Sequence, residues 1–515
     1  MTQHADPALA TTLPQLIRAA AARYGDATAI TLDSNDGQTG ALTFVELERQ
    51  SARIARGLLA RGVGKGSRVG FIYGNNPSFA VMFAAIARIG AVAVPVSTFI
   101  RANELVRVLR QSDITGLIVQ RTLLGKDYVQ RVCEALPELA QAQNPDLRLS
   151  DVPFLRWVVS SGPSLPAGIY PQEWLTEACD SVSETLLEAI ESEVHPADQI
   201  VEIYTSGSMA LPKGVRHDHG PVLFRTHFIR SKTPLERGKV VTVPMPFFWV
   251  GGLMMYLLPN WEIGATSRCT ESTSTNSRIA MGSVMAPGDE YTLPEGQTIW
   301  ALGMTETLGP YAYGDEMRAP GYPLCAPLDH IADRFEVRVV NSDEQPVAEG
   351  DTGEIQVRGY ALSPGLHKIE KHTYLTRDGF YRTGDMATVQ GKRILFVGRD
   401  GDIIKTVGSN VSPAEVEMEM QKLPGIHSAY VVGLPDKERG QKVVAAVVPR
   451  DGAQLDFDEI QKTLAQQLSS FKVPRAYIAI TRDEVPMLPS NKVARRAIEK
   501  LIQERLDQRV SLLER

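Results

Sequence analysis

In the first part of the chain, apolar residues at helical spacing follow a capping signal. Thr43 and Glu46 have the spacing of a capping box, in which each side chain bonds to the other residue's backbone N–H. Gly62 is placed where such a helix would end. The pattern therefore predicts a helix with one buried face, whose apolar positions are Leu47, Ile54 and Leu58.

Strands are predicted on both sides of a second helix, which begins at Pro77 and ends at Gly90. The long apolar run over residues 79–96 includes Arg88 and Gly90, so it indicates a helix followed by a buried strand and no membrane span. Alternation of strand and helix is typical of βαβ units, so a parallel sheet is expected. The predicted strands cover residues 69–73, 91–96 and 116–119.

The C-terminal part of the chain has the pattern of a separate small α+β domain. Ser412, Pro413 and Glu415 supply an N-cap, an N1 proline and a capping-box glutamate. The apolar positions that follow are Val416, Met420 and Leu423. Strands are predicted over residues 429–432, 443–448 and 477–480, with a helix over residues 456–468.

Length and charge narrow the class of protein. A chain of 515 residues is longer than one hydrophobic core usually supports, so at least two domains are expected. The formal net charge of −6 gives no electrostatic reason to expect nucleic acid as a partner.

The N-terminus lacks the basic and apolar regions of a secretion signal, which favours a cytoplasmic protein. The cysteines have no paired spacing, which argues against disulfides and zinc: Cys133, Cys179, Cys269 and Cys325.

Residues 204–214 form a loop suited to a polyphosphate. The loop follows an apolar run, and its small residues let backbone N–H groups face an anion. Pro212 occupies the place of a Walker A glycine, and the chain contains no Gly-x-Gly-x-x-Gly sequence. Composition alone leaves an ordinary Ser/Gly-rich turn equally open. The candidate phosphate ligands are Thr205, Ser206, Gly207, Ser208 and Lys213.

Further motifs follow this loop in a fixed order. They are Leu-Gly-Met-Thr-Glu-Thr at 302–307, Gly-Glu-Ile-Gln-Val-Arg-Gly at 353–359, Tyr-Arg-Thr-Gly-Asp at 381–385, Gly-Arg-Asp-Gly-Asp-Ile-Ile-Lys at 398–405, and a final segment at 486–492. Taken together, they resemble the adenylate-forming superfamily, which contains acyl-CoA synthetases, peptide-synthetase adenylation domains and luciferases. The resemblance extends from about Leu16 to about Arg496.

This resemblance implies an α/β fold and a two-step reaction. A large AMP-binding domain, residues 1–400, would contain doubly wound sheets and a distorted small β-barrel. Residues 401–515 would form a mobile α+β lid. ATP and Mg²⁺ would activate a fatty or aromatic carboxylic acid as an acyl-adenylate, and coenzyme A would then take the acyl group.

The resemblance also assigns catalytic and nucleotide-binding roles. Lys492 would bridge the acyl carboxylate and the α-phosphate, while Glu306 would bind Mg²⁺ and Thr305 the α-phosphate. Asp385 would receive both ribose hydroxyls, assisted by Arg399. Each of these residues could instead be an ordinary polar residue of a turn or strand end. The remaining predicted ATP contacts are Gly303 and Met304.

Acid binding and the second step are assigned to other segments. Asp402 would be the hinge of the small domain, and the loop with Lys405, Gly408 and Asn410 would replace Lys492 during thioester formation. The proposed acyl pocket would consist of Phe247, Phe248, Trp249 and Gly252. Packing in the hydrophobic core is nearly as good an interpretation of these residues.

Departures from the family pattern keep other functions open. Met209 and Ala210 replace a threonine and a glycine in the phosphate loop, and Leu302 replaces an adenine-stacking aromatic. The stretch from Gly252 to Gly303 is also shorter than in the family, which predicts a reduced sheet and a truncated or exposed acid site. One alternative is a degenerate nucleotide-binding protein without turnover. Another is an adenylating enzyme that loads an acyl carrier protein.

Overall fold

The computed structural model divides the chain into two compact units. The first consists of Met1–Ser283, Gly303–Pro310 and Gly359–Thr373, and the second of Val284–Leu302, Tyr311–Arg358 and Tyr374–Arg515. The predicted boundary after residue 400 falls outside the described residues and stays a prediction. No helix within the described part is both long and apolar enough to cross a membrane. The described residues are 9–34, 39–100, 102–205, 212–233, 235–271, 300–314, 328–399, 404–406, 409–411, 413–436, 440–468, 472–487 and 493–513.

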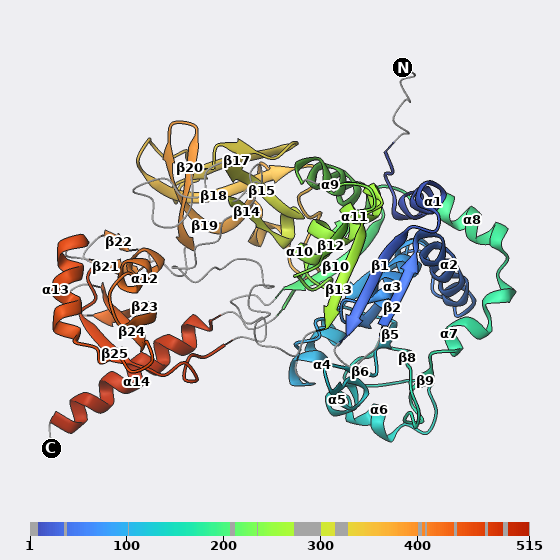
Figure 1. Ribbon diagram of the computed structural model, residues 1–515, viewed down its shortest axis with the longest axis horizontal. Coiled ribbons are helices and arrows are strands. Elements are labelled where there is room, and N and C mark those ends of the chain that lie inside the picture. Colours follow the sequence, from blue (N-terminus) through green and yellow to red (C-terminus); the bar gives the residue numbers. More distant parts are fainter. Residues whose placement is uncertain are drawn as a thin grey trace. The chain divides into compact units, whose positions relative to one another are not determined.

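The first unit is an α/β structure with two main sheets (Figure 1). Its helices are α1 (Leu13–Tyr24), α2 (Phe44–Ala60), α3 (Pro77–Ala87), α4 (Ala102–Gln111), α5 (Tyr128–Ala135), α6 (Pro137–Gln141), α7 (Trp174–Glu177), α8 (Glu184–Ser192), α9 (His219–Lys232), α10 (Val250–Gly252) and α11 (Leu258–Ile263). Its strands are β1 (Thr28–Ser34), β2 (Thr39–Thr43), β3 (Arg68–Ile72), β4 (Val92–Pro95), β5 (Gly116–Val119), β6 (Thr122–Leu123), β7 (Lys126–Asp127), β8 (Trp157–Ser160), β9 (Tyr170–Pro171), β10 (Gln199–Thr205), β11 (Lys213–Asp218), β12 (Val240–Thr242) and β13 (Thr266–Glu271).

The predicted βαβ region is confirmed. Strands β3, β4 and β5 pair in parallel within a seven-stranded sheet of order β11-β10-β4-β3-β5-β8-β9. Both halves of the predicted capping box are present at α2: Thr43 accepts from the Glu46 N–H, and Glu46 accepts from the Thr43 N–H. Helix α3 begins at Pro77, behind an Asn76 cap, and is buried on all sides. Such a uniformly apolar helix is typical of a core position between layers.

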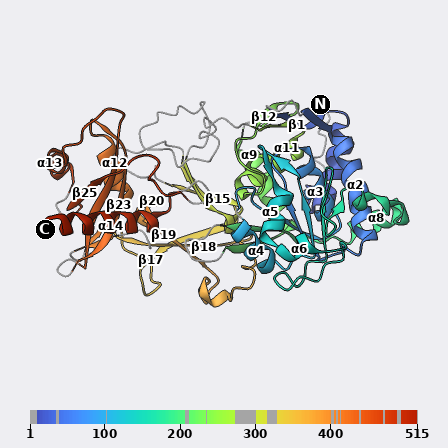
Figure 2. The same ribbon diagram turned by 90° about the horizontal axis from the view of Figure 1, so that it is seen from below.

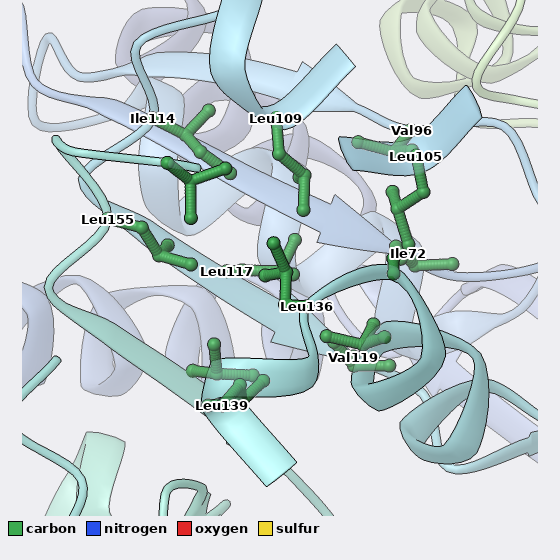
Figure 3. Packing of buried hydrophobic residues seen from close by; sticks show 14 of the residues in the cluster. Ile72, Val96, Leu105, Leu109, Ile114, Leu117, Val119, Leu136, Leu139 and Leu155 are labelled. Atoms are coloured by element: carbon green, nitrogen blue, oxygen red, sulfur yellow. The ribbon is translucent and has the colours of Figure 1, made fainter. Parts of the chain in front are cut away.

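One face of the seven-stranded sheet is covered by α4, α5 and α6, which lie next to one another in both views (Figures 1 and 2). The cluster between them joins Leu105 and Leu109 of α4 to Leu117 and Val119 of β5 (Figure 3). Side chains at alternate strand positions share one face of a sheet, which is why Leu117 and Val119 both face these helices. The cluster therefore packs these three helices against β5.

Strand β13 was not predicted, because its residues are mostly polar. It pairs in parallel with β1 and with β12, giving a sheet of order β12-β13-β1-β2. Ser267 and Cys269 are fully buried, whereas Arg268 between them pairs with Asp33 at 2.7 Å. The shortened region between Gly252 and Gly303 therefore still contributes one strand, β13, to this sheet. Residues 272–299, which make up most of the rest of that region, lie outside the described residues.

The second unit contains antiparallel strands and the C-terminal α+β segment. Its strands are β15 (Gly309–Gly314), most of which belongs here, β16 (His330–Ile331), β17 (Phe335–Val340), β18 (Thr352–Gly359), β19 (Tyr381–Gln390), β20 (Arg393–Arg399), β21 (Ile404–Thr406), β22 (Ser409–Val411), β23 (Ile426–Asp436), β24 (Gly440–Pro449) and β25 (Ala476–Ala479). Its helices are α12 (Pro413–Gln421), α13 (Phe457–Gln467) and α14 (Arg495–Leu513).

The helix and strand predictions for the C-terminal segment are confirmed. The pair β23–β24 is buried on both faces: Val431 and Val443 pack with α12 and α13, and Val432 and Val444 pack with Ile498 of α14. Figure 2 shows α14 running along this sheet. Ser412, the predicted cap of α12, lies outside the described residues. The segment thus has its own two-sided hydrophobic core.

Candidate active site

The predicted magnesium ligand lies in a tight turn of the first unit. Strand β14 (Trp300–Met304) leads into a 3₁₀ turn, η4 (Thr305–Thr307), in which Glu306 is buried to 8% exposure. Leu308 follows with φ of 55°, a left-handed conformation that non-glycine residues rarely adopt. The Thr307 hydroxyl donates to the Gly309 carbonyl at 2.7 Å. A short, internally bonded turn therefore holds the Thr305–Glu306 pair.

Gly303 is required by the packing of this turn. A Cβ at Gly303 would lie 2.5 Å from the backbone carbonyl of Gly309, which is closer than real contacts allow. The main chain on both sides of the Thr305–Glu306 pair therefore approaches itself with no room for a side chain. Met304, the other residue predicted to touch the nucleotide, is half-buried at the end of β14.

Two groups from other elements hold the turn by its carbonyl oxygens. The His217 Nε2 on β11 lies 2.8 Å from the Thr305 carbonyl oxygen, and the Ser363 N–H donates to the Glu306 carbonyl at 2.7 Å. Neither His217 nor Ser363 was singled out from the sequence. A histidine at an inward-facing strand position, two residues before the start of a helix, was the only signal in the pattern.

The phosphate loop is carried by the hairpin of β10 and β11. Thr205 and Lys213 are paired residues at its end, so the hairpin brings together the two outer members of the predicted phosphate-binding set. Ser206, Gly207 and Ser208, together with Met209 and Ala210, lie outside the described residues. The role of the loop in binding phosphate stays a prediction.

A buried acid that was not predicted from the sequence belongs to this hairpin. Glu202 of β10 is fully buried, accepts from the Tyr204 hydroxyl at 2.7 Å, and pairs with Arg68 at 3.3 Å. The His367 Nδ1 lies 3.7 Å from the same carboxylate. Burial and then the Glu202 charge raise the pKa of Tyr204, so its hydroxyl remains a donor. An acid inside an apolar strand run was the available signal.

The predicted ribose ligand lies in the second unit. Asp385 on β19 is 3% exposed and faces Arg399 on β20, with the Arg399 Nε 2.8 Å from an Asp385 carboxylate oxygen. The structure thus brings together the two residues that the sequence analysis paired. The Arg399 contact fixes the orientation of the carboxylate, as an acceptor for two hydroxyl groups requires.

The residues of the predicted acyl pocket occupy different environments. Phe247 is fully buried with its ring centroid 5.3 Å from that of Phe79, whereas Phe248 and Trp249 contact Phe99 at 5.6 and 5.8 Å. A Cβ at Gly252 would lie 2.0 Å from the Pro246 carbonyl oxygen. A π-helical turn, η2 (Leu253–Leu257), follows directly, and such turns are frequent at functional sites. The pocket assignment stays a prediction.

The remaining predicted residues belong to the C-terminal segment. Lys405 lies in β21, opposite Asn410 of β22. Lys492, Asp402 and Gly408 lie outside the described residues, so their roles as catalytic cation, hinge and thioester-step loop are untested.

Two family models match the chain in order. The model for AMP-binding enzymes matches residues 17–284, just over half of the chain, and the model for the AMP-binding enzyme C-terminal domain matches residues 415–492. The chain belongs to the AMP-binding enzyme family. The resemblance stated from the motifs is therefore confirmed.

Relatives in this family match the chain over most of its length. A feruloyl-CoA synthase of an Amycolatopsis species is 29% identical, covering 88% of this chain and 92% of its own. The mitochondrial medium-chain acyl-CoA ligase ACSF2 of Bos taurus is 25% identical, covering 90% and 84%. The anthranilate CoA ligase AuaEII, solved with anthranoyl-AMP, superposes with a TM-score of 0.75 at 18% identity, covering 98% and 100%. This last likeness concerns the fold, which is the expected mixed α/β architecture.

Proposed function

We propose that this AMP-binding enzyme is an ATP-dependent acid:CoA ligase that activates a fatty or aromatic carboxylic acid. The observation that carries the proposal is the similarity to acid:CoA ligases along nearly the whole chain. The acid's carboxylate attacks the α-phosphorus of ATP, pyrophosphate leaves, and an acyl-adenylate forms. The thiol of coenzyme A then attacks the acyl carbon and AMP leaves. Neither step needs a covalent enzyme nucleophile.

Within this proposal, the phosphate groups of ATP are held by the β10–β11 hairpin and the Thr305–Glu306 turn. Lys213 contributes charge, Thr205 contributes a hydroxyl donor, and Ser206, Gly207 and Ser208 complete the loop. Thr305 hydrogen-bonds the α-phosphate, while Asp385 and Arg399 fix the ribose. Met304 and Gly303 lie along the nucleotide. Fixed donors stabilise charge that develops on phosphoryl oxygens, without reorganising during the reaction.

Glu306 fits a magnesium ion that is shared with the substrate. Its buried side chain lies on a turn in which the Thr305 and Glu306 carbonyls are both held. No group of three or more metal-ligating side chains occurs among the described residues. Mg²⁺ is usually bound by one or two carboxylates together with substrate phosphates, so a single acid is sufficient. When bound, Mg²⁺ would neutralise charge on the phosphate oxygens.

The two steps require different catalytic groups. Lys492 supplies the cation for adenylation, and the segment of Lys405 and Gly408 takes its place for thioester formation after rotation at Asp402. Residues 1–400 would then act as the nucleotide- and acid-binding domain, and residues 401–515 as the lid. The acid lies against Phe247, Phe248, Trp249 and Gly252.

Incubation of the full chain with ATP, Mg²⁺, coenzyme A and a panel of fatty and aromatic acids tests the proposal. Mass spectrometry should detect a CoA thioester and AMP in equal amounts with at least one acid. Acyl-adenylate without thioester would indicate a carrier-protein acceptor. ATP binding with no product from any acid would favour the degenerate alternative, which Met209 and Ala210 in the phosphate loop keep open.

A further inference from the structure

The hydrogen bond from His217 defines the protonation of its ring. A carbonyl oxygen can only accept, so the Nε2 that lies 2.8 Å from the Thr305 oxygen must carry the proton. His217 is fully buried, and burial lowers its pKa to about 4. The ring is therefore neutral at pH 7, with a single donor directed at Thr305. Its Nδ1 has no hydrogen-bond partner among the described residues.

This bond fills the remaining acceptor position of the Thr305 carbonyl. The Thr305 carbonyl also accepts the Leu308 N–H at 3.2 Å, so both of its lone pairs are used. The neighbouring Glu306 carbonyl accepts the Ser363 N–H. Rotation of the peptide group between Thr305 and Glu306 would break the His217 bond. Contacts from outside the turn, made by His217 and Ser363, thus fix the backbone that carries the Glu306 side chain.

His217 also belongs to the element that carries the phosphate loop. It lies four residues from Lys213 along β11, a span of roughly 13 Å at ordinary strand spacing. Strand β11 is the edge of its sheet, and residues 363–367 brace it there. The Ser363 hydroxyl donates to the Arg216 carbonyl at 2.8 Å, and the His367 N–H donates to the Gly214 carbonyl at 2.7 Å. One braced strand therefore links Lys213 to the Thr305–Glu306 turn.

We infer that His217 is a positioning residue that sets Glu306 relative to the phosphate-loop hairpin, by holding the Thr305 carbonyl. This inference rests on the proposed function, because it assigns Glu306 to magnesium. The magnesium dependence of adenylation therefore reports on it. A purely structural histidine would change the amount of folded enzyme and leave that dependence unaltered.

Three variants separate these cases. His217→Leu removes the donor, and His217→Gln retains an N–H donor. His219→Gln is the matched control. His219 is equally buried, but its Nδ1 accepts the N–H of Leu13, a residue of α1 and not of the turn. Acid-dependent ATP–pyrophosphate exchange is measured against Mg²⁺ concentration at saturating ATP.

The Mg²⁺ concentration for half-maximal exchange should rise about tenfold in His217→Leu, the effect of one buried hydrogen bond. His217→Gln should recover most of this shift, and His219→Gln should show none. Equal magnesium dependence in His217→Leu and His219→Gln would overturn the inference.

If the wild-type protein shows no exchange with any acid, the proposed function fails, and amide hydrogen exchange still tests His217. The Leu308 and Ser363 amides should then exchange about tenfold faster in His217→Leu than in His219→Gln. Unchanged exchange at both amides would contradict the positioning role independently of turnover.

Discussion

At the scale of single residues, the proposed nucleotide site depends on charged groups whose partners fix their orientation. Asp385 is nearly inaccessible, and Arg399 holds one of its oxygens at 2.8 Å. The carboxylate that Arg399 orients can accept hydrogen bonds from two hydroxyl groups. An amide of the same shape would replace one acceptor by a donor.

Asp385→Asn should therefore weaken nucleotide binding and leave folding largely intact. Charge-assisted hydrogen bonds contribute about 1.5–3 kcal/mol, so the KM for ATP should rise roughly tenfold to hundredfold. Asp378→Asn is the control, since Asp378 is half-exposed and pairs with Arg338 at 2.7 Å in the same unit. An equal KM for ATP in the two variants would argue against a ribose contact at Asp385.

Burial of His219 should make the free energy of unfolding depend on pH. Burial lowers the pKa of His219 to about 3, whereas an unfolded histidine titrates near 6.5. Below pH 6.5 the unfolded chain binds a proton that the folded protein excludes. The free energy of unfolding should therefore fall as pH falls, by at most about 1.4 kcal/mol per pH unit for this group.

Urea unfolding of the wild type and of His219→Gln at pH 7.5, 6.5 and 5.5 measures this contribution. The variant should lose less stability than the wild type between pH 6.5 and 5.5, because its glutamine does not titrate. Parallel pH dependence in both proteins would show that His219 is protonated in the folded state.

At the scale of secondary-structure elements, close backbone approach governs the turn that bears Glu306. A methyl group at Gly303 would meet the Gly309 backbone at 2.5 Å, and neither chain segment can yield as a flexible side chain could. Gly303→Ala should cost about 1–3 kcal/mol of stability, or move the Thr305–Glu306 pair and lower adenylation. Gly64→Ala is the control, since its added Cβ meets nothing within 4 Å.

Thermal unfolding and pyrophosphate exchange on both variants decide this prediction. If Gly303→Ala matched Gly64→Ala in both measurements, the close approach at Gly303 would be unimportant.

The helices and strands also differ in how far the sequence could predict them. The start of α2 follows from Thr43 and Glu46, because a capping box is a local interaction. Strand β13 was missed because pairing with β1 and β12, rather than its own composition, makes it a strand. The contact of His217 with Thr305 joins residues far apart in sequence, so no local pattern could indicate it. Asp385 and Arg399 were predictable as a pair only through the family motifs.

At the scale of the whole molecule, the proposed reaction requires the C-terminal segment to serve two steps in turn. Asp402→Pro would fix φ at the proposed hinge and restrict the preceding residue. Adenylation should persist within about threefold if the first pose is retained, while CoA thioester formation should fall by roughly a hundredfold. Asp402→Ala leaves both dihedral angles free and should retain most of the second step. Equal loss of both steps in Asp402→Pro would argue against a hinge there.

Formation of acyl-adenylate from ATP and an acid, without coenzyme A, tests the proposed ligase most directly. The wild type should accumulate acyl-adenylate with at least one acid of the panel. Lys492→Ala should be slower by about a hundredfold or more, because a preorganised cation stabilises charge in the transition state. Lys500→Ala should match the wild type, since Lys500 is 78% exposed on α14. No acyl-adenylate from any acid, or equal rates in Lys492→Ala and Lys500→Ala, would contradict adenylation by this chain.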